Sequence, residues 1–298
     1  MGLDINAVQF LIAARKRGVE FGEVLTLGRQ DLNVFPAKMC KVLRASGLSD
    51  ELFRPEAADT RYAEPIFKTL GAKQVYSMDF SAYEGASFVH DLNKPIGPDL
   101  RERFDLVYDG GTLEHVFHFP TALRNTMEMV RVGGHLFIHT GANNYCGHGF
   151  YQFSPELFFR ALSRVNGFKV ERMVIHPMGP YGSWREVADP EDIRSRVELI
   201  TFYPVQLLVQ ARRLSAAQVF VETPQQSDFV PRWDEQPGAK PKEEPSTKQP
   251  VYGAPRPKLA KVFPGVARLL NVLKIGFGLL RTHSLSNRRS FRRVKRMD

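Results

Sequence analysis

The stretch Phe104–Thr140, FDLVYDGGTLEHVFHFPTALRNTMEMVRVGGHLFIHT, decides the fold of this chain. It opens on a short apolar run, FDLVY, that ends at Asp109-Gly110-Gly111. A short apolar run is typical of a buried parallel strand, and glycines after it are typical of a loop that faces a ligand. We therefore predict a strand from Phe104 that enters a ligand-facing loop at Asp109.

A helix and a second strand follow in the same stretch. Leu123, Met127 and Val130 recur at helical spacing and would form one apolar face. Gly133-Gly134 ends this helix, and residues 135–139 read as the next strand. The stretch is thus a strand–helix–strand unit, and its loops fall at the carboxyl ends of strands, where open α/β sheets bind ligands.

Four short motifs in this stretch resemble a known family. They are Asp105-Leu106-Val107, Leu113-Glu114-His115-Val116, Ala122-Leu123 and Arg131-Val132-Gly133-Gly134. Their order and spacing are similar to the second half of a class I S-adenosylmethionine (SAM) methyltransferase domain of the small-molecule branch. The resemblance implies a Rossmann-like, mostly parallel sheet of seven strands, of which the last is antiparallel. An ordinary Rossmann-like unit with another ligand is the alternative, because a fold does not determine a function.

The first strand and its turn depart from the pattern of that family. Residues 24–28 read as the strand, and the family commonly continues with a glycine-rich turn that lets the backbone approach the methionine part of SAM. This chain offers Gly28-Arg29-Gln30-Asp31-Leu32, with only the first glycine. Either Arg29 and Gln30 cover the cofactor with their side chains, or the site is degenerate and binds no SAM. We favour the first.

The resemblance assigns the remaining cofactor contacts to the ends of later strands. Asp79, at the end of the strand at residues 74–79, would accept hydrogen bonds from the ribose hydroxyls, or else only cap a loop. Asp91 would lie near the adenine amino group and Leu92 against the adenine ring. The same resemblance places Phe80, Asp109 and Gly110 beside the cofactor.

The acceptor side falls in the loops after the fourth and fifth strands. Glu114-His115 lies in the first loop, and residues 143–153 place amides, a histidine and aromatic side chains among glycines in the second. We expect four residues there to contact the acceptor: Glu114, Asn143, Tyr145 and Tyr151. His115 or His148 would be the general base, since neutral imidazole accepts a hydroxyl proton near pH 7. Either histidine could also be structural or merely polar.

No set of histidines and carboxylates has the spacing of a metal site, and we expect no metal. Asp109-Gly110-Gly111 resembles the metal-dependent sugar O-methyltransferases, in which such an aspartate helps to hold a divalent ion. The partnering acidic residues are not evident in the sequence.

The composition describes a chain that can bury one large α/β core, with 298 residues of which 43% are hydrophobic. Its two cysteines, Cys40 and Cys146, form no disulfide framework, so a reducing, cytoplasmic setting is expected. No stretch is long and uncharged enough to span a bilayer, and the N-terminus lacks the pattern of a signal peptide.

The net charge of +9 is concentrated near the C-terminus. Residues 256–298 hold 12 of the 41 basic groups and one of the 32 acidic groups, which leaves 29 basic and 31 acidic groups before them. A nucleic-acid-binding body is therefore not indicated. We divide the chain into a methyltransferase domain at 1–223, a proline-rich linker at 224–257 and a basic amphipathic tail at 258–298. The tail could be solvated, bind RNA or a protein, or lie on an anionic membrane and make the protein peripheral to it.

The second half of the domain holds the remaining expected elements. We expect a strand at 168–176, a substrate lid at 178–185, a short helix at 205–213 and an antiparallel edge strand at 217–222. The function expected from all of this is SAM-dependent methyl transfer to an oxygen of a small or glycan-like polar acceptor. The competing expectation is a non-catalytic methyltransferase-like scaffold that acts through its tail.

Overall fold

The structure, a computed structural model, describes residues 2–54, 61–179, 182–228 and 283–296. Six α-helices are present among these residues: α1 Ile5–Lys16, α2 Pro36–Ala45, α3 Glu64–Thr69, α4 Phe119–Met129, α5 Pro155–Ala161 and α6 Pro190–Ile193. Four short 3-10 helices join them: η1 Glu51–Phe53, η2 Pro98–Leu100, η3 Leu113–His115 and η4 Arg164–Asn166.

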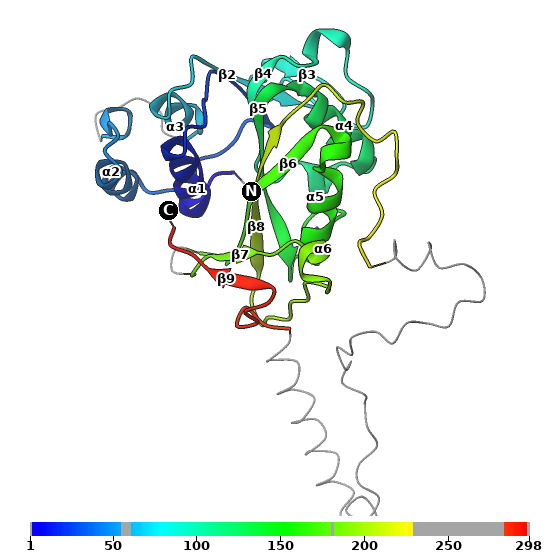
Figure 1. The fold of residues 1–298 in the computed structure, drawn as a ribbon. Helices are drawn as coiled ribbons and strands as arrows, with labels where there is room; N and C mark the ends of the chain where they lie inside the picture. The colour runs from blue at the N-terminus through cyan, green and yellow to red at the C-terminus, as the bar shows by residue number, and fades with distance from the viewer. Residues whose placement is uncertain (1, 55–60, 180–181, 229–282, 297–298) are drawn as a thin grey trace, which may run out of the picture.

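The described strands form one nine-stranded sheet in the order β3-β2-β1-β4-β5-β8-β6-β7-β9 (Figure 1). Their bounds are β1 Glu23–Leu27, β2 Gln74–Asp79, β3 Phe88–Val89, β4 Phe104–Asp109, β5 Val130–Asn143, β6 Phe168–Pro177, β7 Arg185–Val187, β8 Val205–Arg213 and β9 Phe291–Arg293. The first five strands pair in parallel, and β8 lies antiparallel between β5 and β6. The expected Rossmann-like sheet with a parallel core is confirmed, with β7 and β9 added at one edge.

Residues 205–213, expected from the sequence to form a short helix, instead form the strand β8, which lies antiparallel to both of its neighbours. Hydrogen-bonded neighbours cover both its edges and helices cover both faces of the sheet, so eight of its nine residues are buried. A strand buried on both faces shows no apolar–polar alternation, and its apolar run cannot be told from a helix by periodicity. Its position inside the sheet also corrects the expectation of an antiparallel edge strand.

Residues 217–222, expected to be that edge strand, form no strand. They make an irregular segment in which Val219 is 2% exposed and joins the core. The backbone NH of Phe220 donates to Oδ1 of Asn166 at 2.8 Å, and Phe220 has a left-handed φ of 58°. A strand residue does not adopt that conformation.

Each face of the sheet has its own hydrophobic core. Helices α1, α2 and α3 cover one face and α4, α5 and α6 lie on the other (Figure 1). Helix α1 is buried along most of its length, and Asp4 caps it by accepting hydrogen bonds from the backbone NH groups of Asn6 and Ala7. The sheet is thus packed between two apolar layers, and the ends of its strands are where polar groups can be placed.

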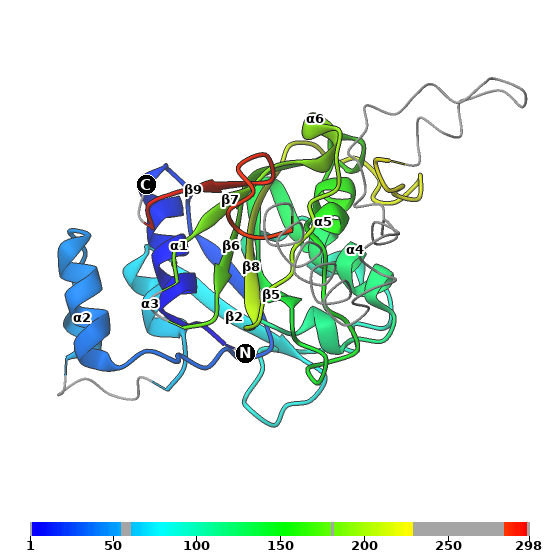
Figure 2. The ribbon, with the colours of Figure 1, turned by 90° about the horizontal axis from the view of Figure 1, so that it is seen from below.

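The end of the expected basic tail belongs to this fold. Strand β9 pairs antiparallel with β7 and lies near α1 (Figure 2). Phe291 is 3% exposed, Arg292 Nε donates to Glu186 Oε2 at 3.0 Å, and Arg296 donates to the carbonyl of Gly182. Residues 283–296 are therefore not a tail decoupled from the core, because they bury apolar surface and complete a sheet edge.

The segment expected to be a substrate lid, residues 178–185, is packed into the core at Trp184. Trp184 is fully buried, and its Nε1 donates to Oδ1 of Asn6 on α1 at 3.1 Å. Residues 229–257 of the expected linker and residues 258–282 of the expected basic amphipathic tail lie outside the described residues. Within the described ranges, no helix has the length and apolar character needed to cross a bilayer.

Candidate functional site

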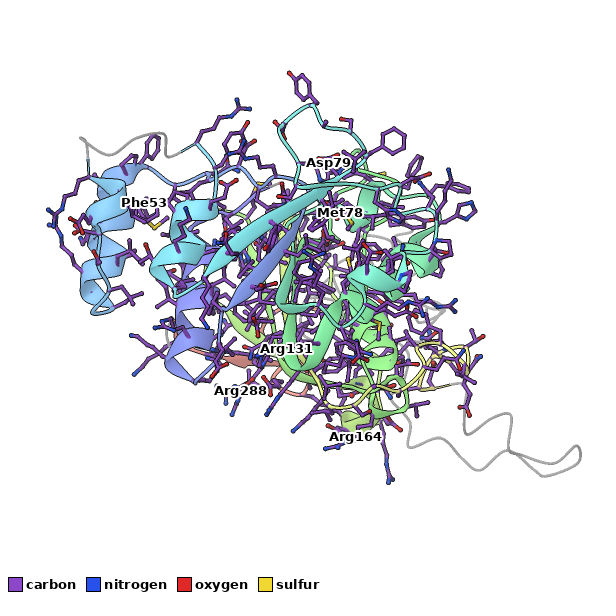
Figure 3. The ribbon with its side chains drawn as sticks, turned by 90° about the horizontal axis from the view of Figure 1, so that it is seen from above. Phe53, Met78, Asp79, Arg131, Arg164 and Arg288 are labelled. Carbon is purple, nitrogen blue, oxygen red and sulfur yellow. The ribbon has the colours of Figure 1, made fainter. Side chains whose placement is uncertain are left out.

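The carboxyl ends of β1 and β2 bring two of the expected cofactor residues together. Gly28 has a φ of +69°, and its NH donates to the carbonyl of Met78 at 2.6 Å. A Cβ atom built on Gly28 would lie 3.3 Å from Thr112 Oγ1 and 3.8 Å from Asp79 Oδ2. Figure 3 shows Asp79 next to Met78 at this end of the sheet. A residue without a side chain at position 28 therefore lets a ligand approach the backbone beside a carboxylate.

Asp79 and Phe80 lie at the end of β2, at the solvent-exposed border of this region. Asp79 is partly exposed, and its Oδ1 accepts a hydrogen bond from the backbone NH of Phe80 at 2.6 Å. The side chain of Phe80 is 72% exposed. The carboxylate is accessible to hydroxyl donors and the ring offers an apolar surface beside it, as a nucleoside would require.

Arg29 follows β1 and is held by contacts with α3 and with the loop after β2. Its Nε donates to Glu64 Oε1 at 2.7 Å and its Nη1 to the carbonyl of Glu84 at 3.0 Å. Its guanidinium carbon also lies 3.8 Å from the ring centroid of Tyr62. These contacts hold Arg29 between α3 and the loop after β2, where a planar guanidinium can pair and stack at once.

Gln30 occupies the space between the ends of β1 and β4. It is 6% exposed, and a Cβ atom on Gly110 would lie 2.0 Å from its Oε1. Gly110 itself accepts a hydrogen bond from the NH of Gly2 at 3.0 Å, so the N-terminal segment passes over this strand end. Gln30 Oε1 accepts no hydrogen bond among the residues that the structure describes. A buried amide oxygen without a donor fits a position that a ligand group completes.

Asp91 and Leu92 follow β3 in a tight turn. Asp91 Oδ1 accepts hydrogen bonds from the side chain and the backbone NH of Asn93, at 2.8 and 3.0 Å, and these bonds lower the pKa of Asp91. Leu92 is 7% exposed and packs in the core. Asp91 is thus in a position to accept from a ligand at the turn, whereas Leu92 contributes mainly to the packing beneath it.

Asp109 is fully buried at the end of β4. Its Oδ1 accepts hydrogen bonds from the NH groups of Thr112 at 2.9 Å and Leu113 at 3.3 Å. Its Oδ2 accepts none within the described part of the chain. Burial and the nearby Glu114 raise the pKa of Asp109 to about 8. At neutral pH this group is therefore mainly a carboxylic acid, which can donate a hydrogen bond through Oδ2.

Glu114, His115 and His148 form a cluster at the ends of β4 and β5. Glu114 is 1% exposed, and its Oε1 lies 3.5 Å from His148 Nε2. Its Oε2 accepts a hydrogen bond from Thr140 Oγ1 at 3.2 Å. The rings of His115 and His148 are edge to face with centroids 4.8 Å apart. Partial burial lowers the pKa of His115, so this imidazole is neutral at pH 7.

The backbone of Glu114 holds the loop that carries His148. Its carbonyl accepts hydrogen bonds from the NH groups of Phe150 at 2.8 Å and Tyr151 at 3.3 Å. Gly149, which directly precedes Phe150, has a φ of +72°. These contacts bring His148 close to Glu114, which lies 34 positions earlier in the sequence. Local sequence patterns do not show such a contact.

The three other expected acceptor residues do not all converge on this cluster. Tyr145 does, since its ring lies 5.8 Å from that of His148 and burial raises its pKa to about 12. Asn143 instead donates to Thr201 Oγ1 at 3.1 Å. Tyr151 donates from its hydroxyl to the carbonyl of Phe117 at 2.7 Å and so anchors the loop.

A second group of polar side chains, of which His139 and His176 are buried, was not evident as a group from the sequence. His139 and His176 are 1% and 0% exposed, with ring centroids 5.9 Å apart, and Asp4 acts on both electrostatically. Burial lowers the pKa of His139, and burial together with His139 lowers that of His176 to about 4. His139 lies within β5 and faces the interior of the protein. Asp4 and His176 gave no signal, because they lie far from the motif in sequence.

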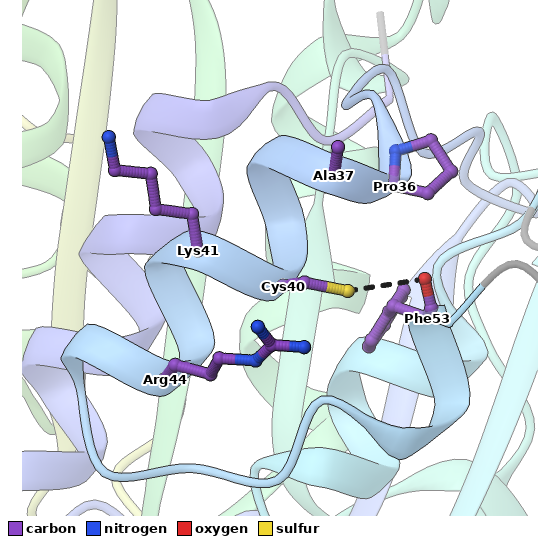
Figure 4. Close-up of a pocket in the computed structure, with 6 residues that line it drawn as sticks. All are labelled: Pro36, Ala37, Cys40, Lys41, Arg44 and Phe53. Carbon is purple, nitrogen blue, oxygen red and sulfur yellow. Dashed lines mark hydrogen bonds between the residues drawn. The ribbon is translucent and has the colours of Figure 1, made fainter.

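Two open cavities lie elsewhere. One, of about 430 Å³, lies between α2 and η1 and is lined by Cys40, Arg44 and Phe53 among others (Figure 4). The other, of about 620 Å³, lies at the amino ends of the strands near Asp105, Arg131 and His135. The carboxyl ends of parallel strands are the usual ligand-binding edge, so neither cavity is the candidate active site.

The residues at the strand ends fit SAM in part. Gly28 lets a ligand approach the backbone, and the carboxylates of Asp79 and Asp91 can accept hydrogen bonds from a nucleoside. The buried Oε1 of Gln30 has no hydrogen-bond donor among the described residues. Arg29, expected to cover the cofactor, is in contact with Glu64, Tyr62 and Glu84.

The strand order, with the parallel strands β3-β2-β1-β4-β5 and the antiparallel β8 between β5 and β6, defines an α/β sheet that resembles the Rossmann-like fold of the class I SAM-dependent methyltransferases. No protein-family model matches the chain, and no curated protein does. A methyltransferase from Burkholderia thailandensis, solved with 1,6-didemethyltoxoflavin and S-adenosylhomocysteine, is 16% identical, with 71% of this chain and 80% of that chain covered and a TM-score of 0.37.

Two further solved structures are similar at the same level. A SAM-dependent methyltransferase from Thermotoga maritima, described as a possible histamine N-methyltransferase, is 13% identical, with 70% of this chain and 89% of that chain covered and a TM-score of 0.36. The branched-chain polyamine synthase from Thermus thermophilus is 15% identical, with 74% and 60% covered and a TM-score of 0.36. This chain therefore spans about three fifths of the synthase. Such likeness concerns the fold alone.

Proposed function

We propose that this protein transfers the methyl group of SAM to a hydroxyl of a small or glycan-like polar acceptor. The single observation that carries the proposal is the cluster of Glu114, His115 and His148, which combines a buried carboxylate with two imidazoles at the ligand-binding edge of a methyltransferase-like sheet. Polar groups are costly to bury, so such a cluster indicates a site at which a proton or a cation is handled.

The cofactor would lie over the ends of β1, β2 and β3. Asp79 would accept hydrogen bonds from the ribose hydroxyls, Phe80 would cover the nucleoside, and Asp91 would lie beside the adenine. Gly28 and Gly110 would let the backbone approach, with Asp109 and Gln30 near the methionine part. SAM supplies an electrophilic methyl group on a sulfonium, and the role of the chain is to hold and align the acceptor oxygen.

The acceptor would lie between the loops after β4 and β5. Tyr145 would contact it and exclude water, and His115 or His148 would take the hydroxyl proton as the oxygen attacks the methyl carbon. The low pKa of His115 suits this role, because a base must be unprotonated at the working pH. Glu114 would hold the imidazolium that results, since its carboxylate lies 3.5 Å from His148.

The test of this chemistry is the loss of turnover without loss of cofactor binding. His115→Gln and His148→Gln should each lower the methylation rate by about 10²–10⁴, the usual loss for a general base. S-adenosylhomocysteine affinity, measured by isothermal titration, should stay within about threefold of wild type. His118→Gln is the matched control, because His118 is exposed in the same loop region. Full turnover in both variants on the true acceptor would place the base elsewhere.

A second candidate function is a methyltransferase-like scaffold that binds no SAM. The arrangement of Arg29 and Gln30 favours it, since the first is held by Glu64 and the second fills the space beside Gly110. Isothermal titration of the full chain with S-adenosylhomocysteine separates the two candidates. Saturable binding supports the enzyme, and no heat at any concentration supports the scaffold.

A further inference from the structure

The cluster at the ends of β4 and β5 has the residues of a metal site. Glu114 and His115 lie on η3, and His148 lies on the loop that follows β5. One ligand atom from each of these three side chains lies within 4.8 Å of the other two. A mixed set of one carboxylate and two imidazoles is a common way to hold a divalent transition-metal ion.

The carboxylate of Glu114 is oriented as a metal ligand would be. Thr140, itself fully buried, donates to Oε2 at 3.2 Å and thereby fixes the carboxylate plane. The other oxygen, Oε1, is buried and accepts no hydrogen bond within the described residues. His148 Nε2 is likewise a buried atom without a hydrogen-bond partner there. A cation between the two would compensate both atoms, whereas a buried carboxylate oxygen left unpaired is costly.

The spacing of these atoms also suits one ion. Two ligands that each lie about 2.1 Å from a metal at a near-tetrahedral angle are about 3.4 Å apart. Glu114 Oε1 and His148 Nε2 are 3.5 Å apart. His115 is exposed on the outer side of the cluster, so rotation of its side chain can complete the set without a change in the backbone.

We propose that Glu114, His115 and His148 bind one divalent transition-metal ion at the acceptor side of the site. Three protein ligands leave coordination positions open for exogenous oxygen ligands. The backbone hydrogen bonds from Phe150 and Tyr151 to the carbonyl of Glu114 hold the two loops in register, so the site is built by the fold rather than by the ion alone.

This inference deepens the proposed function and rests on it only where the acceptor is concerned. An acceptor hydroxyl that occupies an open position would lose its proton to solvent more readily, because the cation lowers its pKa. The oxygen would then form a bond to the methyl carbon as the sulfur–carbon bond of SAM breaks and S-adenosylhomocysteine leaves. In this state the two imidazoles are ligands and accept no proton; the cation makes the hydroxyl more acidic, and solvent water takes the proton.

Zn²⁺ alone is the probe for the test. The full chain, freed of metal by a chelator and dialysed, is titrated with Zn²⁺ by isothermal calorimetry. We expect one ion per chain. We expect each of three variants to bind Zn²⁺ at least about tenfold more weakly: Glu114→Gln, His115→Gln and His148→Gln. Even substitutions of residues that only hydrogen-bond to metal ligands lower metal affinity by about 10–100-fold. His118→Gln and Cys146→Ser are the controls and should bind as wild type does.

Several outcomes would overturn the inference. They are no binding by wild type, unchanged binding by the His148 variant, or loss of binding in Cys146→Ser, which would move the ion to a thiolate. If Glu114→Gln fails to fold, as judged by its thermal melt, His115→Gln still decides, because His115 is exposed. Titration with S-adenosylhomocysteine in parallel separates the two proposals. Zn²⁺ binding without cofactor binding contradicts only methyl transfer, and the reverse contradicts only the metal site.

Discussion

A Cβ atom on Gly149 would lie 2.7 Å from the carbonyl oxygen of Glu114, and the φ of Gly149 is +72°. The loop that carries His148 therefore crosses the backbone of Glu114 at a point where no side chain fits. This approach is what brings a histidine from the loop after β5 to a carboxylate at the end of β4. The glycine at this position is thus a structural requirement of the cluster.

Gly149→Ala should displace this loop and destabilise the protein. A left-handed φ costs an alanine roughly 1 kcal/mol, and the contact with Glu114 adds to it. Gly147→Ala is the matched control, because a Cβ there would have no atom within 4 Å. Thermal melting of both variants, with turnover or Zn²⁺ affinity as the second readout, checks the prediction. Equal effects of the two substitutions would contradict it.

The buried carboxyl of Asp109 should make stability fall as the pH rises. Its folded pKa of about 8 lies above the ordinary value of 3.8, so the folded state holds a proton that the unfolded state has released. This contribution is fully present below about pH 4 and is lost as the pH rises through 8, by up to about 1.4 kcal/mol for each pH unit.

Asp109→Asn isolates this effect, because the amide oxygen can still accept from the NH groups of Thr112 and Leu113. Denaturant unfolding at pH 6, 7 and 8 should show a wild-type stability that falls relative to the variant. If the difference between the two proteins stays constant over this range, Asp109 is already ionised in the folded state.

The C-terminal strand should stabilise the fold. Phe291 is 3% exposed within β9, and truncation of a buried phenylalanine costs roughly 3–5 kcal/mol. Phe291→Ala should therefore lower the melting temperature by several degrees, with the lower end of the range expected because β9 lies at a sheet edge. Arg288→Ala is the control, since Arg288 is exposed three residues earlier (Figure 3). Equal melting temperatures would show that β9 does not contribute.

Asp79 should contribute to cofactor affinity. If it accepts hydrogen bonds from the ribose, Asp79→Ala should weaken S-adenosylhomocysteine binding by roughly 1.5–3 kcal/mol, the range for hydrogen bonds to a charged group. Asp99→Ala provides the comparison, because Asp99 is exposed in the η2 turn. An unchanged dissociation constant in a folded Asp79 variant would remove this residue from the site.

The sequence by itself was sufficient for the parallel core of the sheet. The run at Phe104–Asp109 and the strand that ends at Asp79 were both predicted, because local apolar patterning and glycines report strands and the loops that follow them. The resemblance to methyltransferases rests on the same local motifs. Strand β8 was taken for a helix, since a strand buried on both faces carries no alternation.

Only the tertiary structure decided which polar groups meet. Glu114 and His148 are 34 positions apart in the sequence. They meet because the loop after β5 packs against the backbone of Glu114 at Gly149, and this packing depends on both loops together. The attachment of Arg29 to Glu64 and the pairing of β9 with β7 are likewise long-range. Burial by distant segments also raises the pKa of Asp109 and lowers that of His176. Neighbouring residues in the sequence determine local conformation, whereas desolvation and side-chain contacts depend on segments that only the fold brings together.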